Sequence, residues 1–168
     1  VVGRAARHPA VTHTVREATD GDADDVIRLL DAAMLEFDRE RARRRVDDGD
    51  VLVAVVRGHN REERRASTDG DTAGHDERVV GACVLSDSEA ASTEIEQIAV
   101  HRSRRGRGIG TSLVETAATR TDGPLVARFR GNVRPFYESL GFAIDALESA
   151  GGDDPEDPDR DRLRGVLR

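Results

Sequence analysis

The sequence predicts an α/β (α+β) fold built on a mixed, mostly antiparallel central sheet with helices on both faces. Three short segments rich in Val and Ile follow one another without a helix between them, which favours antiparallel pairing: 51–56, 79–85 and 93–100. Two later strands, 125–129 and 142–147, each follow a helical segment, as parallel strand–helix–strand units do. Each long helix has one apolar face to bury, so both faces of the sheet are expected to be covered.

The N-terminal part predicts a tail, a strand and a helix. Residues 1–13 are polar and irregular, and Thr14–Ala18 has the composition of a short strand. Asp20–Asp22 then starts a helix, whose apolar face is formed by Val26, Ile27, Leu30, Ala33, Met34 and Phe37. Met34 and Phe37 could line an acceptor pocket, but their helical spacing favours core packing. The charged run Arg39–Arg45 is expected to continue the helix in solvent.

The segment 58–77 separates two predicted strands and differs from its surroundings. It contains almost no apolar residue and many charges, which indicates a disordered insertion. Residues 14–168, which include this insertion, have the length and the apolar content of one domain.

The C-terminal part alternates helices and strands. The helix from Gly108 to Arg120 has its apolar face at Ile109, Leu113, Val114 and Ala117. A strand at 125–129 precedes a short helix at 133–140, which Gly141 ends, and the strand 142–147 follows. The acidic stretch 151–161 predicts a loop, and 163–167 predicts a closing strand.

The charged residues are unusual in kind. All 26 basic residues are Arg, and with 33 acidic residues the net charge is −7. A dense acidic surface without Lys is typical of a salt-adapted protein, because salt screens the repulsion between carboxylates. A GC-rich genome would also favour Arg over Lys, but it would not give the acidic excess. We therefore expect a halophilic archaeal source.

Several sites and locations are disfavoured by the composition. Cys83 is the one cysteine, so no intrachain disulfide can form, and its apolar strand indicates a core residue. The five histidines are scattered, so no metal centre is expected. The sequence shows no signal-peptide pattern and no apolar stretch of membrane-spanning length, so we expect a cytoplasmic protein with no membrane partner.

A basic, glycine-rich turn joins the strand 93–100 to the helix that begins at Gly108. The first N–H groups of a helix lack partners within it and lie at the positive end of its dipole. Gly106, Gly108 and Gly110 let the backbone approach an anion closely. Four arginines add positive charge: Arg102, Arg104, Arg105 and Arg107. The turn therefore predicts a phosphate or pyrophosphate site.

The glycine spacing narrows the kind of phosphate site. No Gly-Lys-Ser/Thr follows, so the turn is not a Walker loop, and Gly-x-Gly-x-Gly differs from the Gly-x-Gly-x-x-Gly dinucleotide fingerprint. On the turn alone, two other interpretations remain: a plain helix N-terminus with basic flanks, or a patch for a nucleic-acid backbone. The net acidity and the 3% aromatic content argue against nucleic acid.

Two motifs resemble those of the GNAT N-acetyltransferase family. Arg105-x-x-Gly108-x-Gly110 is similar to the family's acetyl-CoA signature, Gln/Arg-x-x-Gly-x-Gly/Ala, and Ile98-Ala99-Val100 resembles the strand before it. Further along, Phe136-Tyr137-Glu138-Ser139-Leu140-Gly141-Phe142 resembles the family's Phe-Tyr-Glu-x-x-Gly-Phe. The resemblance covers residues 14–142 and is loose before Val51. It implies the acyl-CoA N-acyltransferase (GNAT) fold and an acyltransferase activity.

The resemblance also implies how acetyl-CoA is bound as co-substrate. Backbone groups of Ile98, Ala99 and Val100 would bind the pantetheine arm where the strands 93–100 and 125–129 separate. Backbone N–H groups of the turn would bind the pyrophosphate, and Thr111 could add a hydroxyl; the residues of the turn are Arg105, Gly106, Arg107, Gly108, Ile109 and Gly110. Asn132 is a candidate contact, although it lies five residues before Tyr137 where many members have seven.

The catalytic roles follow in part from the same resemblance. Tyr137 stands where the family usually has its general acid, which protonates the departing sulfur. Amine attack requires a neutral nitrogen, and a carboxylate can take its proton directly or through water. Glu94 and Glu96 are the candidates, and regular alternation would place both on one face with Ile98 and Val100. Which of the two acts stays open, as does the alternative that they are solvated residues of the strand end.

Three classes of function compete. The leading one is an acetyl-CoA-dependent N-acetyltransferase that moves an acetyl group directly to a primary amine of a small molecule or a peptide. The second is a non-catalytic acyl-CoA-binding or regulatory module on the same fold. The third is a nucleic-acid-binding protein that uses Arg102–Arg107. The family often dimerises, so the resemblance leaves a homodimer open, but the sequence itself does not indicate the oligomeric state.

Overall fold

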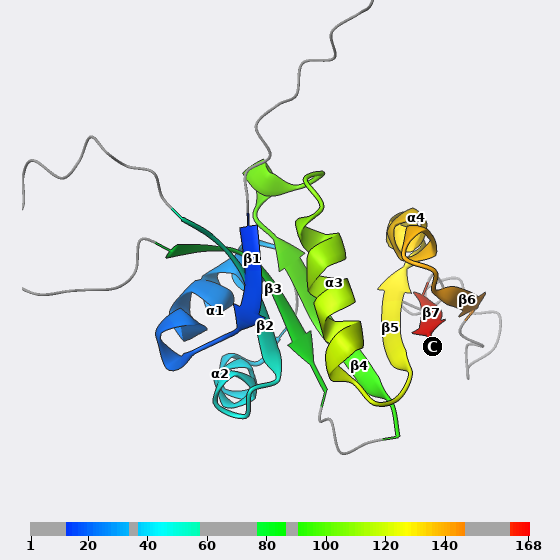
Figure 1. Cartoon of the computed structure of the whole chain (residues 1–168), viewed down its shortest axis with the longest axis horizontal. Helices are drawn as coiled ribbons and strands as arrows, with labels where there is room; N and C mark the ends of the chain where they lie inside the picture. Colours follow the sequence, from blue (N-terminus) through cyan, green and yellow to red (C-terminus); the bar gives the residue numbers. More distant parts are fainter. Residues whose placement is uncertain (1–12, 34–36, 58–76, 87–90, 147–161) are drawn as a thin grey trace, which may run out of the picture.

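The computed structural model of the chain describes residues 13–33, 37–57, 77–86, 91–146 and 162–168. Its centre is a seven-stranded sheet in the order β1-β2-β3-β4-β5-β7-β6 (Figure 1). Neighbouring strands are antiparallel except for β4 and β5, which are parallel. The predicted fold class, a mixed and mostly antiparallel sheet with helices on both faces, is confirmed.

The elements follow the predicted order. The strands are β1 (His13–Glu17), β2 (Val51–Arg57), β3 (Glu77–Leu85), β4 (Thr93–Val100), β5 (Leu125–Arg130), β6 (Ala143–Ala146) and β7 (Arg162–Leu167). The α-helices are α1 (Ala23–Ala32), α2 (Arg39–Asp47), α3 (Ile109–Arg120) and α4 (Arg134–Ser139), and short 3-10 helices are η1 (Asp20–Asp22), η2 (Arg102–Arg104) and η3 (Gly131–Val133).

Most element boundaries differ from the prediction by one or two residues, and three of the differences affect the predicted tail, insertion and first helix. His13 already belongs to β1, and Glu77 begins β3, so the expected tail and insertion each extended one residue too far. The rest of both segments, 1–12 and 58–76, lies outside the described residues, as does Met34. The charged run does not continue the first helix: Asp38 accepts hydrogen bonds from the N–H groups of Glu40 and Arg41 and starts α2 as a separate helix.

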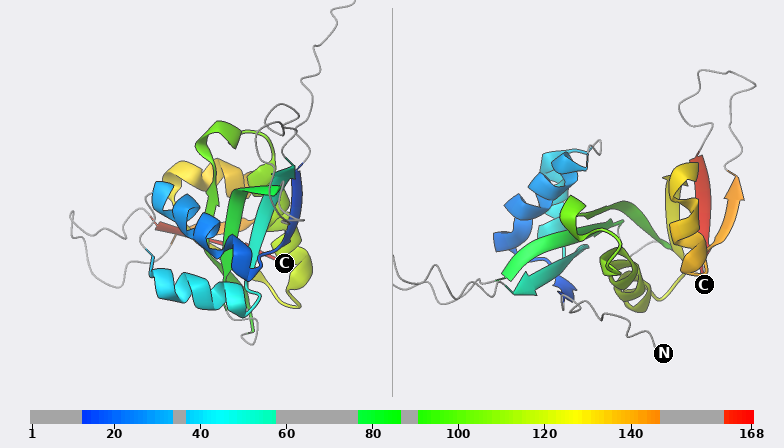
Figure 2. Two further views of the ribbon diagram at one scale, coloured as in Figure 1. Left: turned by 90° about the vertical axis from the view of Figure 1, so that its left-hand side faces the viewer. Right: turned by 90° about the horizontal axis from the view of Figure 1, so that it is seen from above.

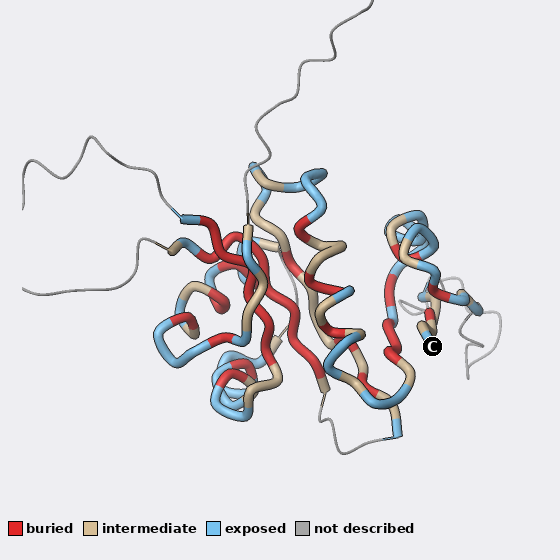
Figure 3. The backbone as a smooth tube through the Cα atoms, in the orientation of Figure 1, coloured by how far each residue is buried: buried red, intermediate tan, exposed pale blue. Residues whose placement is uncertain are grey.

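Two clusters of buried side chains lie on the two faces of the sheet. On one face, α1 and α2 pack Val26, Leu30 and Val46 against the odd-numbered valines of β2. On the other face, α3 packs against Leu52 and its alternate neighbours, and the same cluster continues across β5 to Tyr137 of α4. Figure 2 shows α1 and α2 on the opposite side of the sheet from α3, and Figure 3 shows burial concentrated in the central strands. Because β2 is buried on both faces, its sequence is a continuous apolar run.

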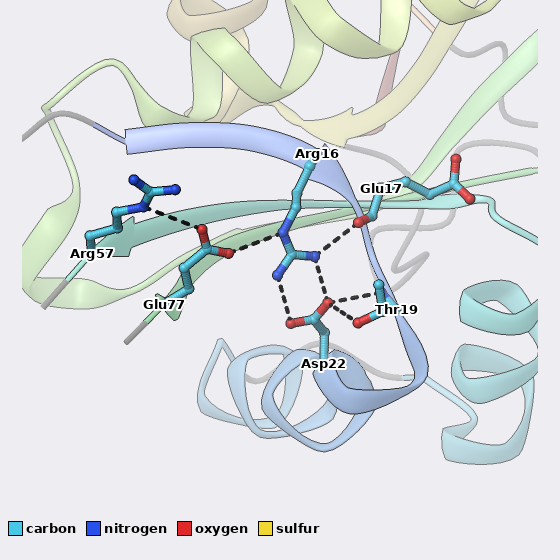
Figure 4. A network of polar contacts seen from close by, with 6 residues as sticks. All are labelled: Arg16, Glu17, Thr19, Asp22, Arg57 and Glu77. Atoms are coloured by element: carbon cyan, nitrogen blue, oxygen red, sulfur yellow. Dashed lines mark hydrogen bonds and ion pairs between the residues drawn. The ribbon is translucent and has the colours of Figure 1, made fainter. Parts of the chain in front are cut away.

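A network of charges fixes the start of α1 to β1 (Figure 4). Arg16 donates to both oxygens of Asp22, at 2.7 and 3.2 Å, and contacts Glu77 of β3 at 3.3 Å. Asp22 also accepts from the N–H and the hydroxyl of Thr19, at 2.8 and 2.9 Å. Burial alone would raise the pKa of Asp22, but the hydrogen bonds from Arg16 and Thr19 outweigh burial and lower it.

None of the described helices is long and apolar enough to span a membrane.

Candidate active site

The strands β4 and β5 separate after a short paired stretch. They pair in parallel only from Thr93 to Ile95 on β4 and from Leu125 to Ala127 on β5. On the β3 side, Val84 pairs with Gln97 and Leu85 with Ile95, so Glu96 is the extra residue of a β-bulge. The bulge therefore coincides with the point where the two strands diverge (Figure 1). Beyond these residues the two backbones do not pair with each other, and we call this unpaired region between the second halves of β4 and β5 the opening.

The backbone of β4 presents polar groups to this opening. The N–H of His101 donates to the carbonyl of Val80 at 2.8 Å, which identifies this pair as a hydrogen-bonded one. By alternation along the antiparallel ladder, Ile98 and Val100 direct their N–H and carbonyl groups away from β3, whereas Ala99 directs its own toward β3. The carbonyl of Val100 accepts a hydrogen bond from Nε of Arg105 at 3.1 Å. Backbone groups of Ile98 and the N–H of Val100 therefore face the opening.

The glycine-rich turn adopts the backbone conformation that its glycines allow. Gly106 and Gly108 have φ angles of 72° and 77°, in the left-handed region, and the space where a Cβ would stand is open at both. Gly108 is the N-cap of α3, and no side chain caps this helix. The first N–H groups of α3 are therefore available to an anion beside the exposed side chains of Arg105 and Arg107.

The start of α3 lies against α4. A Cβ built on Gly110 would stand 3.3 Å from two ring carbons of Phe136, so the two elements lie in close contact at this glycine. Thr111 follows in the first turn of α3 and is half-buried. The contact brings the glycine-rich turn next to the helix that carries Tyr137.

Tyr137 is packed among aromatic rings. Its ring stacks on Phe129 of β5 with centroids 4.1 Å apart, and it meets Phe136 and Phe142 edge-on at 5.1 and 5.2 Å. Gly165 of β7 leaves room for these rings, since a Cβ there would lie 3.1 Å from Phe129 and 3.0 Å from Phe142. The side chain is 4% exposed.

The surroundings of Tyr137 keep its hydroxyl protonated. Burial raises the pKa of Tyr137, and the nearby Cys83 of β3 raises it further. Tyr137 and Cys83 belong to the same cluster of buried residues. A buried, neutral phenol can donate a proton to an anion that forms beside it.

The two candidate carboxylates lie on the other face of β4. The bulge breaks the alternation, so the prediction that Glu94 and Glu96 share a face with Ile98 and Val100 was wrong. Ile98 and Val100 pack with the α3 cluster, whereas Glu96 contacts α2 through Arg41 at 2.7 Å and Arg45 at 3.1 Å. Glu94 contacts Arg128 of β5 at 3.1 Å. Both carboxylates thus lie beside the opening, on the face opposite to α3 and Tyr137.

Comparisons with known proteins agree with this geometry. Residues 72–144 match the family model of the acetyltransferase (GNAT) domain, a span of less than half of the chain. The structure is similar to that of Ard1 from Thermoplasma volcanium, with a TM-score of 0.63 and 20% identity over 94% of this chain and 97% of that one. It is also similar to a GNAT-family acetyltransferase from Bacillus cereus, with a TM-score of 0.64 and 13% identity over 92% and 94% of the two chains. The fold is the GNAT fold.

A further structural match is NAA60 from Arabidopsis thaliana in complex with acetyl-CoA. It has a TM-score of 0.63 and 15% identity over 93% of this chain and 98% of that one. No curated protein sequence matches the chain significantly.

Within the GNAT fold, the remaining predicted residues take different places. Asn132 lies exposed in η3, one turn before α4. Pro135 falls in the first turn of α4, where a missing N–H is tolerated. Cys83 is fully buried, and burial raises the pKa of its thiol to about 12, in agreement with a core residue. Phe37 lies outside the helices and packs at the edge of the α1 cluster.

Several features of this site were missed by sequence reasoning. The bulge at Glu96, the partners Arg41 and Arg45, and the bond from Arg105 to β4 depend on tertiary contacts. The stack of Phe129 on Tyr137 also depends on a tertiary contact. Asp38 did carry a readable signal, because an Asp before a charged helical run is a common N-cap.

Proposed function

We propose that this protein is an acetyl-CoA-dependent N-acetyltransferase that moves an acetyl group to a primary amine by direct transfer. The observation that carries the proposal is the opening between β4 and β5, where an uncapped helix start, outward-facing β4 backbone and a buried tyrosine meet. The match of residues 72–144 to the GNAT domain supports it, as does the complex of NAA60 with acetyl-CoA.

The glycine-rich turn fits a pyrophosphate. Its N-terminal N–H groups, open space at Gly106 and Gly108, and flanking Arg105 and Arg107 match the size and charge of that group. Thr111 and Asn132 would add polar contacts from α3 and η3. We assign the pantetheine arm to Ile98 and Val100, whose outward backbone groups line the opening. Ala99, whose backbone faces β3, is left as the weaker candidate.

Acetyl-CoA supplies the thioester carbonyl at which the amine attacks. Tyr137 is then the proton donor to the departing sulfur, because it is the phenol of the Phe-Tyr-Glu motif and its ring is held from three sides. The acid thus acts from the α3 and α4 face of the sheet.

The attacking amine needs a base, and we place the amine on the opposite face because both candidate carboxylates lie there. Glu94 and Glu96 are both there, so the carboxylate and Tyr137 would serve the two ends of the transfer from opposite sides of β4. Glu96 lies in the bulge at the opening itself, while Glu94 lies in the paired stretch before it. Comparing Glu94→Gln with Glu96→Gln separates them. The variant whose pH–rate profile loses the rise on its acidic side identifies the base, and unchanged profiles in both variants would assign the role to water.

The direct test measures release of free thiol from acetyl-CoA with a panel of amines and peptides. Tyr137→Phe is expected to lower kcat by about 100-fold while acetyl-CoA binding is retained, since one proton transfer is lost. Full activity of this variant across the pH range would remove the acid assignment. Binding of acetyl-CoA with no transfer to any acceptor would favour a non-catalytic acyl-CoA-binding module.

We also propose that the protein is cytoplasmic and salt-adapted, on the basis of its net charge of −7 and its lack of Lys. Its free energy of unfolding should then rise with molar KCl, because salt screens repulsion between the carboxylates. An unchanged or falling stability in KCl contradicts salt adaptation. A homodimer stays a prediction.

A further inference from the structure

One carboxylate of β4 joins α2 to the sheet. Oε1 of Glu96 accepts hydrogen bonds from Arg41 at 2.7 Å and from Arg45 at 3.1 Å. The two arginines stand four residues apart in α2, so they lie on the same face of this helix. Glu96 is the extra residue of the β-bulge, and both arginines therefore reach the point where β4 and β5 diverge. We call Glu96, Arg41 and Arg45 the α2 clamp.

The clamp continues into the turn between α2 and β2. Arg45 also contacts the carboxylate of Asp50 at 3.0 Å, and the side chains of Arg45 and Asp50 are only 12% and 13% exposed. The carbonyl of Asp50 accepts a hydrogen bond from the N–H of Leu85 of β3 at 2.9 Å. Burial alone would lower the pKa of Arg45, but the charge of Glu96 and the contact with Asp50 outweigh burial and raise it. One largely buried arginine thus ties α2 to both β3 and β4.

These contacts make Glu96 poorly suited to act as a base. A proton on its carboxylate would weaken both contacts with the arginines, since they would then lose the attraction between opposite charges. The cost would extend to Arg45, because neutralising one member of a mostly buried ion pair leaves the other charge less well compensated. Glu94 contacts Arg128, whose side chain is half exposed, so the charge of Glu94 is held more weakly.

We propose that the α2 clamp positions α2 beside the acceptor amine, and that Glu96 is a positioning residue and not the general base. This inference rests on the proposed function and leaves Glu94 as the candidate base within it. The amine is placed on the face of β4 that carries both carboxylates, and α2 packs on that same face. A helix held at the bulge limits where an acceptor can lie next to the opening.

Two substitutions of Glu96 separate the positioning role from the role of a base. The amide oxygen of Glu96→Gln can still accept hydrogen bonds from both arginines but cannot take a proton at working pH, and Glu96→Ala can do neither. With acetyl-CoA present, we expect KM for the amine to rise about ten-fold in Glu96→Ala and about three-fold in Glu96→Gln, with smaller changes in kcat. Both variants should keep the rise on the acidic side of the pH–rate profile. Equal losses of kcat in both variants, together with loss of that rise, would make Glu96 the base and overturn the inference.

The arginines of α2 provide a second comparison. Arg41→Ala should also raise KM for the amine, and combining it with Glu96→Ala should raise KM no further than Glu96→Ala alone, because the two partners share one contact. Arg43→Ala is the matched control and should leave KM unchanged, since Arg43 lies on the same helix but forms an exposed pair with Asp24 of α1. An equal change in Arg41→Ala and Arg43→Ala, or additive changes in the double variant, would contradict the clamp.

A measurement without turnover separates this inference from the proposed function. Hydrogen exchange of the α2 amides should be about ten-fold faster in Glu96→Ala than in the native chain, and Arg43→Ala should leave it unchanged. Faster exchange in Glu96→Ala, with no acetyl transfer by the native chain, would support the clamp and refute the transferase. Unchanged exchange in Glu96→Ala, together with transfer by the native chain, would overturn the clamp while the transferase survives.

Discussion

The ring of Phe129 on β5 stacks on the ring of Tyr137 on α4, with planes 15° from parallel. A strand beside the opening thereby sets the orientation of the one tyrosine of the chain. Because the stack fixes the ring plane, it also fixes where the hydroxyl can point.

Phe129→Leu should therefore affect catalysis beyond its effect on stability. We expect a loss of about 1–2 kcal/mol in the free energy of unfolding, from the stacking and the area removed. In the proposed transfer, kcat should fall by a larger factor than the change in KM for acetyl-CoA, because Tyr137 loses the ring on which it stacks. Denaturant unfolding and steady-state kinetics measure the two effects. Phe142→Leu is the control, since it meets Tyr137 only edge-on; equal losses of kcat in both variants would exclude a special role for the stack.

Gly108→Ala tests the start of α3. An alanine at a φ of 77° costs about 1–2 kcal/mol, since its Cβ crowds the backbone in the left-handed region. The strain should also displace the first N–H groups of α3 and weaken acetyl-CoA binding, which calorimetry can measure. Gly21→Ala serves as the control, because that glycine has no positive φ and its nearest neighbour would be 3.9 Å away. Acetyl-CoA affinity that is unchanged in Gly108→Ala contradicts the pyrophosphate assignment.

Asp22→Asn tests the network that fixes α1. The pKa of Asp22 is lowered in the folded chain, so its carboxylate stabilises the fold above the pKa of the unfolded chain, and this stabilisation is lost as the pH falls. At pH 7 we expect a loss of about 2 kcal/mol, and the difference from the native chain should shrink toward acid pH. Asp24→Asn is the control, because Asp24 forms an exposed pair with Arg43. A pH-independent difference for Asp22→Asn would show that its charge is not the cause.

Cys83 should make the fold sensitive to alkali. Burial raises the pKa of its thiol from 9.0 to about 12, so the stability is full below pH 9 and falls as the pH rises above it. The loss should reach about 1.4 kcal/mol by pH 10. Cys83→Ala removes this titration, so urea unfolding at pH 8 and pH 10 should show a smaller alkaline loss in the variant. Equal losses in both proteins would assign the sensitivity to other groups.

Much of the fold could be predicted from the sequence because its signals are local. The valines of β2 and the regularly spaced apolar residues of α3 indicate burial through their pattern alone. The glycines of the turn report a backbone conformation that other residues avoid.

What could not be predicted depends on partners distant in the sequence. The bulge at Glu96 breaks the two-residue alternation, and only the register against β3 reveals it. The position of β7 between β5 and β6, out of chain order, was hidden for the same reason. The catalytic and binding roles of the named residues stay predictions.

The position of β7 has a consequence for the timing of assembly. Since β6 bonds to the sheet only through β7, a growing chain that has already made β6 cannot seat it beside β5. Gly165 of β7 also underlies the rings of Phe129 and Phe142 that surround Tyr137. A nascent chain on the ribosome can therefore form the glycine-rich turn early, but the rings around Tyr137 are fully packed only after β7 has been synthesised.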